Sequence, residues 1–331
     1  MSAAEWLPVV FLGLMGAAML AYVVLDGYDL GVGMLLPRVA RAEKDTMIAS
    51  IGPFWDANET WLVLGVGILL IAFPVAHGMV LGALYLPVAT MLVGLVLRGV
   101  AFDFRVKAQD RWKPLWDRAF FAGSLIAAVS QGWMLGRYVT GLQDGWTQTV
   151  FAAAIAVLLP AAYLLLGASW LVMKTEGALQ DRAITWARGV WPFVVAGMVL
   201  ISIATPLVSE TVRERWFAMP QMLWLAPIPL ITAAALLGAR AMLVPRIARS
   251  TRCWVPFALV VGVFVLGAMG LAYSLFPYVV LDRLTIWQAA SATESLVVIG
   301  IGCAITVPAI VGYTILSYRV FRGKAAPLDY A

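Results

Sequence analysis

Residues 7–36 read LPVVFLGLMGAAMLAYVVLDGYDLGVGMLL, an apolar run whose only charged residues are Asp26 and Asp29. A helix needs about 20 consecutive apolar residues to cross a hydrocarbon core about 30 Å thick. The run therefore predicts a membrane-spanning helix that carries two carboxyl groups. No Lys or Arg precedes it, so we expect this segment to remain in the mature protein rather than to be cleaved as a signal peptide.

The composition of the whole chain agrees with a membrane protein. Of its 331 residues, 63% are hydrophobic and 12% are charged, whereas a soluble domain is about half apolar and about a quarter charged. The sequence predicts an all-α polytopic membrane protein with nine transmembrane helices, forming a single integral membrane domain over residues 1–331. The eight further apolar runs are 55–73, 79–104, 120–142, 150–173, 189–208, 219–244, 255–276 and 290–318.

The basic residues predict the orientation in the membrane. Most of the 23 Lys and Arg residues lie in alternate connections and in the C-terminal tail. The positive-inside rule places those segments in the cytoplasm, so the N-terminus is expected outside and the C-terminus inside. This arrangement requires an odd number of spans, which nine satisfies. Basic residues dispersed over short loops also argue against a nucleic-acid-binding face, despite the net charge of +5.

The two acids of the first span share one helix face, because they are three residues apart. At about 1.5 Å rise per residue, Asp29 lies roughly 33 Å from the start of the run. The pair is therefore expected near the cytoplasmic boundary of the bilayer. Three neighbouring glycines, Gly27, Gly31 and Gly33, would let another helix approach closely.

A second polar cluster, WDANETW, opens the second span and repeats the spacing with Asp56 and Glu59. The third span returns to the same side and brings Arg98 and Asp103 to a similar depth. Neighbouring antiparallel helices are expected to join these groups into one buried polar network. Its predicted members are Asp26, Asp29, Asp56, Asn58, Glu59, Arg98 and Asp103.

Two interpretations of these charges remain open. An Asp at the centre of a membrane helix costs roughly 2.5–3.5 kcal/mol, and carboxylate chains in membrane proteins commonly relay protons. The functional hypothesis is therefore a proton pathway along Asp26, Asp29, Asp56 and Glu59. Alternatively, the acids are interfacial, with Asp56 stabilised by the positive N-terminal end of a helix and Arg98 extending toward the headgroups.

The chain has few residues of the kinds that hold a redox centre. Haem and transition-metal centres draw on His, Cys or clustered carboxylates, and the sequence has one histidine, His77, and two separated cysteines. We expect no catalytic residue here and no metal or cofactor bound by this chain alone. If the chain belongs to an enzyme, its chemistry is expected in another subunit.

Several stretches resemble subunit II of cytochrome bd-type quinol oxidases. They are DGYDLGVG at 26–33, SIGPFWDANETWL at 50–62, RGVAFDFR at 98–105 and LTIW at 284–287. The compact loops late in the chain are similar to the cyanide-insensitive branch of that family. The sequence departs from the family pattern at Ala57, where glycine is common, and at Gln288, where an acid is frequent.

The resemblance implies a fold, partners and a location. It implies two four-helix bundles plus one peripheral helix, paired with a subunit I that binds haems of b and d type. Subunit I would oxidise quinol, and the complex would reduce oxygen to water. Small single-helix accessory subunits and a bacterial cytoplasmic membrane are implied as well.

The resemblance also assigns roles to individual residues. It places the proton path on Asp29 and Asp56, with Asp26 beside them, and links Trp55 and Trp61 to a hydrophobic oxygen route. Ordinary aromatic packing near an interface is the alternative for the tryptophans.

Two other functions compete with an oxidase subunit. A standalone proton-coupled transporter would also use intramembrane acids, but it would place a substrate site near the midplane between repeated halves. Here the acids are expected at one edge, and the motif at 26–33 has no clear counterpart in the second half. In a purely structural scaffold, the polar network would only fix helix packing.

Overall fold

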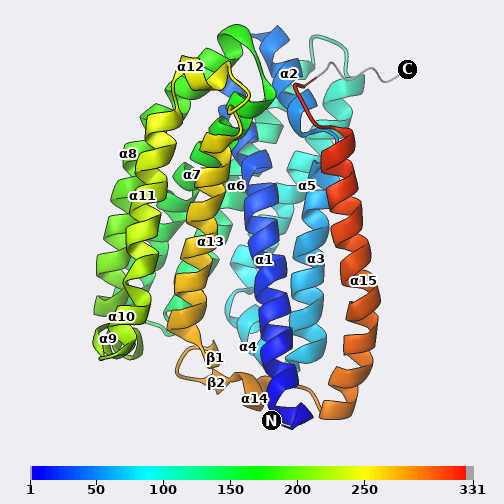
Figure 1. Ribbon diagram of the computed structural model, residues 1–331. Helices are drawn as coiled ribbons and strands as arrows, with labels where there is room; N and C mark the ends of the chain where they lie inside the picture. Colours follow the sequence, from blue (N-terminus) through cyan, green and yellow to red (C-terminus); the bar gives the residue numbers. More distant parts are fainter. Residues whose placement is uncertain (1, 326–331) are drawn as a thin grey trace.

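The computed structural model describes residues 2–325 and is built almost entirely from helices (Figure 1). Within these residues, nine helical segments are long and apolar enough to cross a membrane, which confirms the predicted all-α polytopic class. They are α1 (Ala3–Leu35), α3 (Trp55–Ala72), α5 (Tyr85–Lys107), α6 (Lys113–Val139), α7 (Trp146–Lys174), α8 (Gly177–Val208), α10 with α11 (Gln221–Leu225 and Pro227–Met242), α13 (Val255–Leu275) and α15 (Thr293–Val320).

Short elements connect the spans at both ends of the molecule. They are η1 (Leu36–Arg38), α2 (Arg41–Ile51), α4 (Pro74–Ala83), α9 (Glu210–Phe217), α12 (Pro245–Ala248), β1 (Tyr278–Val280), β2 (Leu284–Thr285) and α14 (Ile286–Ala289). Strands β1 and β2 form an antiparallel hairpin beside the start of α1. Several consecutive spans pack side by side, as α5 with α6, α6 with α7 and α7 with α8, whereas α15 packs against α1 and α3 and not against α13.

The spans form two four-helix bundles and one peripheral helix. Helices α1, α3, α5 and α6 make the first bundle, and α7, α8, α11 and α13 make the second. The two bundles meet where α7 packs against α1 and α6. Helix α15 lies outside, against α1 and α3, and only Leu296 and Ser317 of its residues are buried. Figure 1 shows α15 at the edge of the first bundle, away from α8 and α11.

The two ends of the molecule differ in charge. The start of α1 and the end of α15 lie at opposite ends of the helix array (Figure 1). We call the end that carries α2, α12 and the end of α15 the basic end, because the Lys- and Arg-rich connections gather there.

Three of the predicted spans begin more than five residues from the start of the helix, at Met79, at Gly189 and at Phe120, where α6 already begins at Lys113. The run predicted to begin at Met79 starts inside α4, and the membrane-length helix begins only at Tyr85, after a break at Leu84. The span predicted from Gly189 begins at Gly177 instead, because its first three turns are amphipathic and bury Leu179 and Ala183. An apolar-run criterion detects the part of a helix that suits hydrocarbon and misses an amphipathic extension beyond it.

A glycine contact fixes the junction of the two bundles. A Cβ atom added at Gly31 of α1 would lie 1.9 Å from the carbonyl oxygen of Tyr163 in α7. A Cβ at Gly167 of α7 would in turn lie 2.5 Å from the backbone nitrogen of Val32. Neither position has room for a side chain, so the backbones of α1 and α7 are in direct contact. Small residues commonly serve this purpose between membrane helices.

The substitution Gly31→Ala should therefore destabilise the protein. Overpacking a tight contact costs about 1–3 kcal/mol, so the midpoint of thermal unfolding in detergent should fall. The control is Gly16→Ala in the same helix, where an added Cβ meets nothing within 4 Å. Equal midpoints for the two variants would show that this helix contact is not tight.

Candidate functional site

The two acids of α1 are buried inside the first bundle. Asp26 is 1% exposed and Asp29 is fully buried. Because α7 packs on the glycine side of α1, the carboxyl groups turn toward the other helices of the first bundle. Asp26 meets α5 and Asp29 meets α3. Asp26 and Asp29, which the sequence predicts near the membrane boundary, are thus enclosed by protein and shielded from water.

Arg98 connects three helices of the first bundle. Its guanidinium, 1% exposed, pairs through Nη1 with Oδ1 of Asp26 at 2.5 Å and through Nη2 with Oε1 of Glu59. The Glu59 side chain is 29% exposed, so the ion-pair group reaches from the centre of the bundle to its surface. Burying one charge without a partner is strongly unfavourable, and the two carboxylates supply those partners.

Asn58 binds the second acid of α1. Its Nδ2 group donates to Oδ2 of Asp29 at 2.8 Å and to the hydroxyl of Tyr28 at 2.9 Å. Within the described part of the chain, the other oxygen of Asp29, Oδ1, is buried without a hydrogen-bond partner. The cluster formed by Asp26, Asp29, Asn58, Glu59 and Arg98, which we call the acid cluster, has three carboxyl groups and one guanidinium. Binding a proton reduces its excess negative charge.

Two predicted members of the network lie outside the acid cluster. Asp56 is exposed in the first turn of α3, and Asp103 is exposed on α5. Asp103 follows Arg98 by five residues, which rotates its side chain by about 140° around the helix. Asp103 therefore does not reach the acid cluster, because the helical period turns it to a different face of α5 from Arg98.

The two tryptophans of the motif lie on different surfaces of α3. Trp55 is half-buried, with its ring 5.1 Å from that of Phe102. Trp61 is 9% exposed and packs with Ala18 and Tyr22 of α1. Both positions are surrounded by apolar or aromatic groups.

Sequence reasoning missed a second buried polar group, which lies next to the acid cluster. Nε2 of Gln131 donates to the hydroxyl of Tyr22 at 2.8 Å, and the hydroxyl of Tyr163 donates to Oε1 of Gln131 at 2.6 Å. Tyr22 lies one turn before Asp26 on the same face of α1. The available signal was the amide of Gln131 inside the predicted span 120–142.

Sequence reasoning also missed an ion-pair group at the basic end. Arg105 of α5 pairs with Asp117 of α6 at 2.5 Å and with Asp45 of α2 at 2.7 Å. Lys44 of α2 completes the group by pairing with Asp117 at 2.9 Å. These contacts hold α2 against the ends of α5 and α6. Their partners are far apart in sequence, so no local pattern indicated them.

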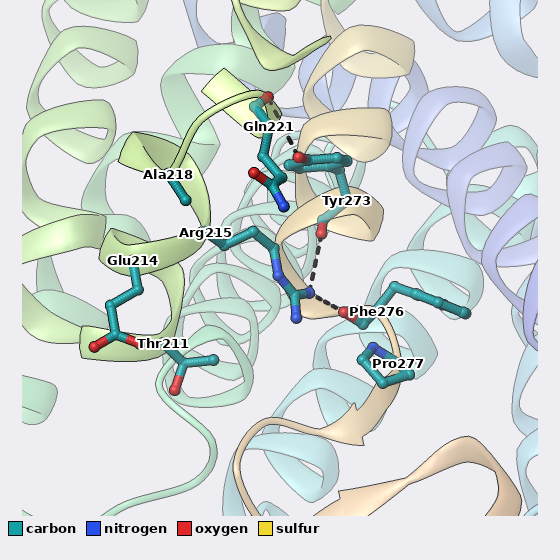
Figure 2. Close-up of a pocket in the computed structure, with 8 residues that line it drawn as sticks. All are labelled: Thr211, Glu214, Arg215, Ala218, Gln221, Tyr273, Phe276 and Pro277. Atoms are coloured by element: carbon teal, nitrogen blue, oxygen red, sulfur yellow. Dashed lines mark hydrogen bonds between the residues drawn. The ribbon is translucent and has the colours of Figure 1, made fainter. Parts of the chain in front are cut away.

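An open hollow of about 730 Å³ lies at the opposite end of the second bundle (Figure 2). It is lined by residues of α9, α13 and the adjoining segments. The guanidinium of Arg215 donates there to the carbonyl oxygens of Tyr273, Ser274 and Phe276, the last carbonyls of α13. This Arg stabilises a helix end, and the hollow is separate from the acid cluster.

The described residues include one histidine that could serve as a haem ligand. Haem iron is held by His, Cys, Met or Tyr, and the single histidine, His77, lies on the short helix α4. Among residues 2–325, no group of three or more His, Cys, Asp or Glu side chains is placed to hold a metal ion.

Comparison with known proteins gives a consistent result. The family model described as cytochrome bd terminal oxidase subunit II matches residues 7–321. Similar proteins include a probable cytochrome oxidase subunit 2 of Haemophilus influenzae, 29% identical over 97% of this chain and 95% of that protein. Cytochrome bd-I ubiquinol oxidase subunit 2 of Escherichia coli K12 is also 29% identical, over 96% of this chain and 94% of that protein.

Further matches extend to a Gram-positive relative and a solved structure. Cytochrome bd ubiquinol oxidase subunit 2 of Bacillus subtilis is 28% identical over 96% of this chain and 97% of that protein. The bd oxidase structure from Geobacillus thermodenitrificans matches with a TM-score of 0.77 and 16% identity. It covers 96% of this chain and 98% of that chain, and at this identity the likeness concerns the fold.

The ion pairs of Arg98 should contribute strongly to stability. Removing one partner of a buried pair costs about 3–5 kcal/mol, so Arg98→Met should lower the free energy of unfolding by that amount in a denaturant titration. The control is Arg182→Met, which removes the exposed pair with Glu43 and should cost about 0–1 kcal/mol. Similar losses for the two variants would contradict the importance of the buried pair.

Proposed function

The chain belongs to the cytochrome bd terminal oxidase subunit II family, and we propose that it conducts protons through its acid cluster toward subunit I of the same complex. It is a subunit of a quinol oxidase, an oxidoreductase of the respiratory chain. Family membership supports this role over that of a standalone proton-coupled transporter. Oxygen reduction to water consumes protons, so a protein-lined route for them has a direct use in this complex.

The single observation that carries the proposal is the grouping of two buried carboxyl groups and one partly exposed carboxyl group with one buried guanidinium. In a purely structural network, each buried carboxyl group would be expected to have a partner for both of its oxygens. Here Oδ1 of Asp29 is buried without a partner among the described residues. An oxygen of this kind is available to accept a proton. Arg98 keeps its charge at physiological pH, so it positions the carboxyl groups while they carry the proton.

The proposed path runs from Asp29 through Asp26 to Glu59. Asp26 and Glu59 share the guanidinium of Arg98, so a proton bound by one changes the charge balance felt by the other. The half-exposed Glu59 provides the exit from the bundle. Asp56, exposed in the first turn of α3 and one turn from Glu59, is the proposed acceptor beyond that exit.

The orientation supplies the direction of the path. The chain is an integral protein of a bacterial membrane, and we place the basic end in the cytoplasm of the cell by the positive-inside rule. The N-terminus then lies outside and the C-terminus inside. Protons taken up near the basic end would come from the cytoplasm.

Haem binding and quinol oxidation are assigned to subunit I. The complex includes a partner subunit I, and this chain offers a single histidine, His77. We therefore assign the haems of b and d type to the partner, and small single-helix subunits are proposed as further members. Trp55 and Trp61, in apolar and aromatic surroundings, remain the proposed residues of an oxygen route.

The surface formed by α3 and α5 is the proposed docking face for subunit I. Asp56, Thr60 and Val63 are exposed along one side of α3, and Asp103 is exposed on α5. Charged groups facing lipid are costly, and a protein partner would cover them. The residues of α8 from Val190 to Val208, by contrast, contain no charged residue, which suits a lipid-facing surface.

Replacing Asp29 by Asn should reduce turnover without removing haem. The amide keeps the volume of the side chain but cannot take up a proton, so quinol oxidase turnover of the purified complex should fall at least about tenfold. Oxygen consumption measures turnover, and the visible spectrum measures haem content. The matched control is Asp181→Asn at the basic end of the second bundle, where Asp181 forms an exposed pair with Arg249. Full turnover in Asp29→Asn, with haem intact, would favour a structural scaffold.

The docking face can be tested by photo-crosslinking. A photoreactive residue at Val63, exposed on α3, should form a covalent product with subunit I in the membrane. The same residue placed at Ile203, exposed on α8, should not. A product from Ile203 and none from Val63, detected by mass shift on a denaturing gel, would place the partner on the other bundle.

A further inference from the structure

One aromatic hydroxyl of the peripheral helix reaches the acid cluster. Helix α15 lies outside both bundles, yet near the basic end it turns Tyr318 toward the first bundle. The Tyr318 hydroxyl is 2.6 Å from the hydroxyl of Tyr28 and donates to Oδ1 of Asn58 at 3.3 Å. Tyr318 itself is half-buried, so this contact links the interior of the bundle to its surface.

The donors and acceptors around Asn58 close into a ring. Nδ2 of Asn58 donates to the Tyr28 hydroxyl, which leaves the hydrogen of that hydroxyl free for Tyr318. Tyr318 then donates to Oδ1 of Asn58. Each of the three side chains thus donates one hydrogen bond to the next and accepts one from the previous member. The second Nδ2 hydrogen of Asn58 is shared between Oδ2 of Asp29 at 2.8 Å and the carbonyl oxygen of Leu25 at 3.2 Å.

This ring fixes the orientation of the amide that Asp29 contacts. An amide has a donor end and an acceptor end. The Tyr318 hydroxyl binds the acceptor end, so the donor end must face the carboxylate. Without that hydroxyl, Oδ1 of Asn58 would be left without its donor, and rotation of the amide would turn an oxygen toward the carboxylate of Asp29.

Aromatic packing holds Tyr28 and Tyr318 in place independently of the hydrogen bonds of their hydroxyl groups. The Tyr318 ring stacks on Phe54 at 4.6 Å, and the Tyr28 ring stacks on Trp170 at 4.0 Å. Just beyond Tyr318, the carbonyl oxygen of Phe321 accepts a hydrogen bond from Lys174 at 2.7 Å. A phenylalanine at position 318 would therefore keep the stacking and remove only the hydroxyl.

We propose that Tyr318 is a positioning residue for proton transfer, acting through Asn58 to keep a hydrogen-bond donor on Asp29. This inference rests on the proposed role of the acid cluster. It adds that the peripheral helix orients a member of the acid cluster and does not merely pack against the bundle.

The test compares two tyrosines of the same helix in the purified complex. Tyr318→Phe should lower kcat about tenfold, the effect of losing one hydrogen bond of typical strength, with the KM for quinol and the haem content unchanged. The control is Tyr313→Phe, since Tyr313 is exposed on α15, and it should leave kcat unchanged. In the Asp29→Asn background, Tyr318→Phe should cause no further loss, because both changes act on the same step.

Different failures have different meanings. Full turnover in Asp29→Asn would overturn both the proposed function and this inference. Reduced turnover in Asp29→Asn together with normal turnover in Tyr318→Phe would overturn only the role of Tyr318. Loss of haem in Tyr318→Phe would show that Tyr318 is needed for assembly of the complex. A further tenfold loss of turnover in the double variant would show that Tyr318 acts independently of Asp29. Either result would overturn the inference.

Discussion

The pairing of the Arg98 guanidinium with Asp26 and Glu59 is the interaction on which the interior of the first bundle depends. A guanidinium withdrawn from water needs counter-charges at close range, since the desolvation penalty is several kcal/mol for each ion. Backbone packing leaves Arg98 in that position, because a Cβ at Gly123 of α6 would lie 2.8 Å from its backbone nitrogen. The charge is therefore confined between helices, and α1, α3 and α5 remain associated around it.

The contact between the bundles explains why the carboxyl groups point inward. Where α1 meets α7 through Gly31 and Gly167, two backbones touch and no polar side chain fits between them. The acids lie on the remaining side of α1, toward α3 and α5. One face of α1 thus packs closely against α7, and the opposite face carries the acids into the first bundle. The short motif DGYDLGVG supplies the residues of both faces.

Membership of an oxidase complex gives this polar interior a use. Its two half-exposed ends, Tyr318 on α15 and Glu59 on α3, lie on different surfaces of the bundle, and the buried groups lie between them. A purely structural ion pair does not need such continuity. In the proposed function, protons pass along Asp29, Asp26 and Glu59 toward a partner that carries the haems, while Tyr318 holds the amide beside Asp29.

The sequence by itself determined the membrane class, the nine spans and the candidate acids, because the apolar runs and the charges within them are local properties that hydropathy records. It also pointed to the family through motifs that remain contiguous in the chain. Only the tertiary structure decided which acids meet. Asp103 lies on the same helix as Arg98, about 7.5 Å farther along its axis, and faces another side of α5. Tyr318, by contrast, contacts Asn58 although the two are 260 residues apart. Helix rotation and the packing of distant segments set those contacts, and neither leaves a periodic signal in the sequence.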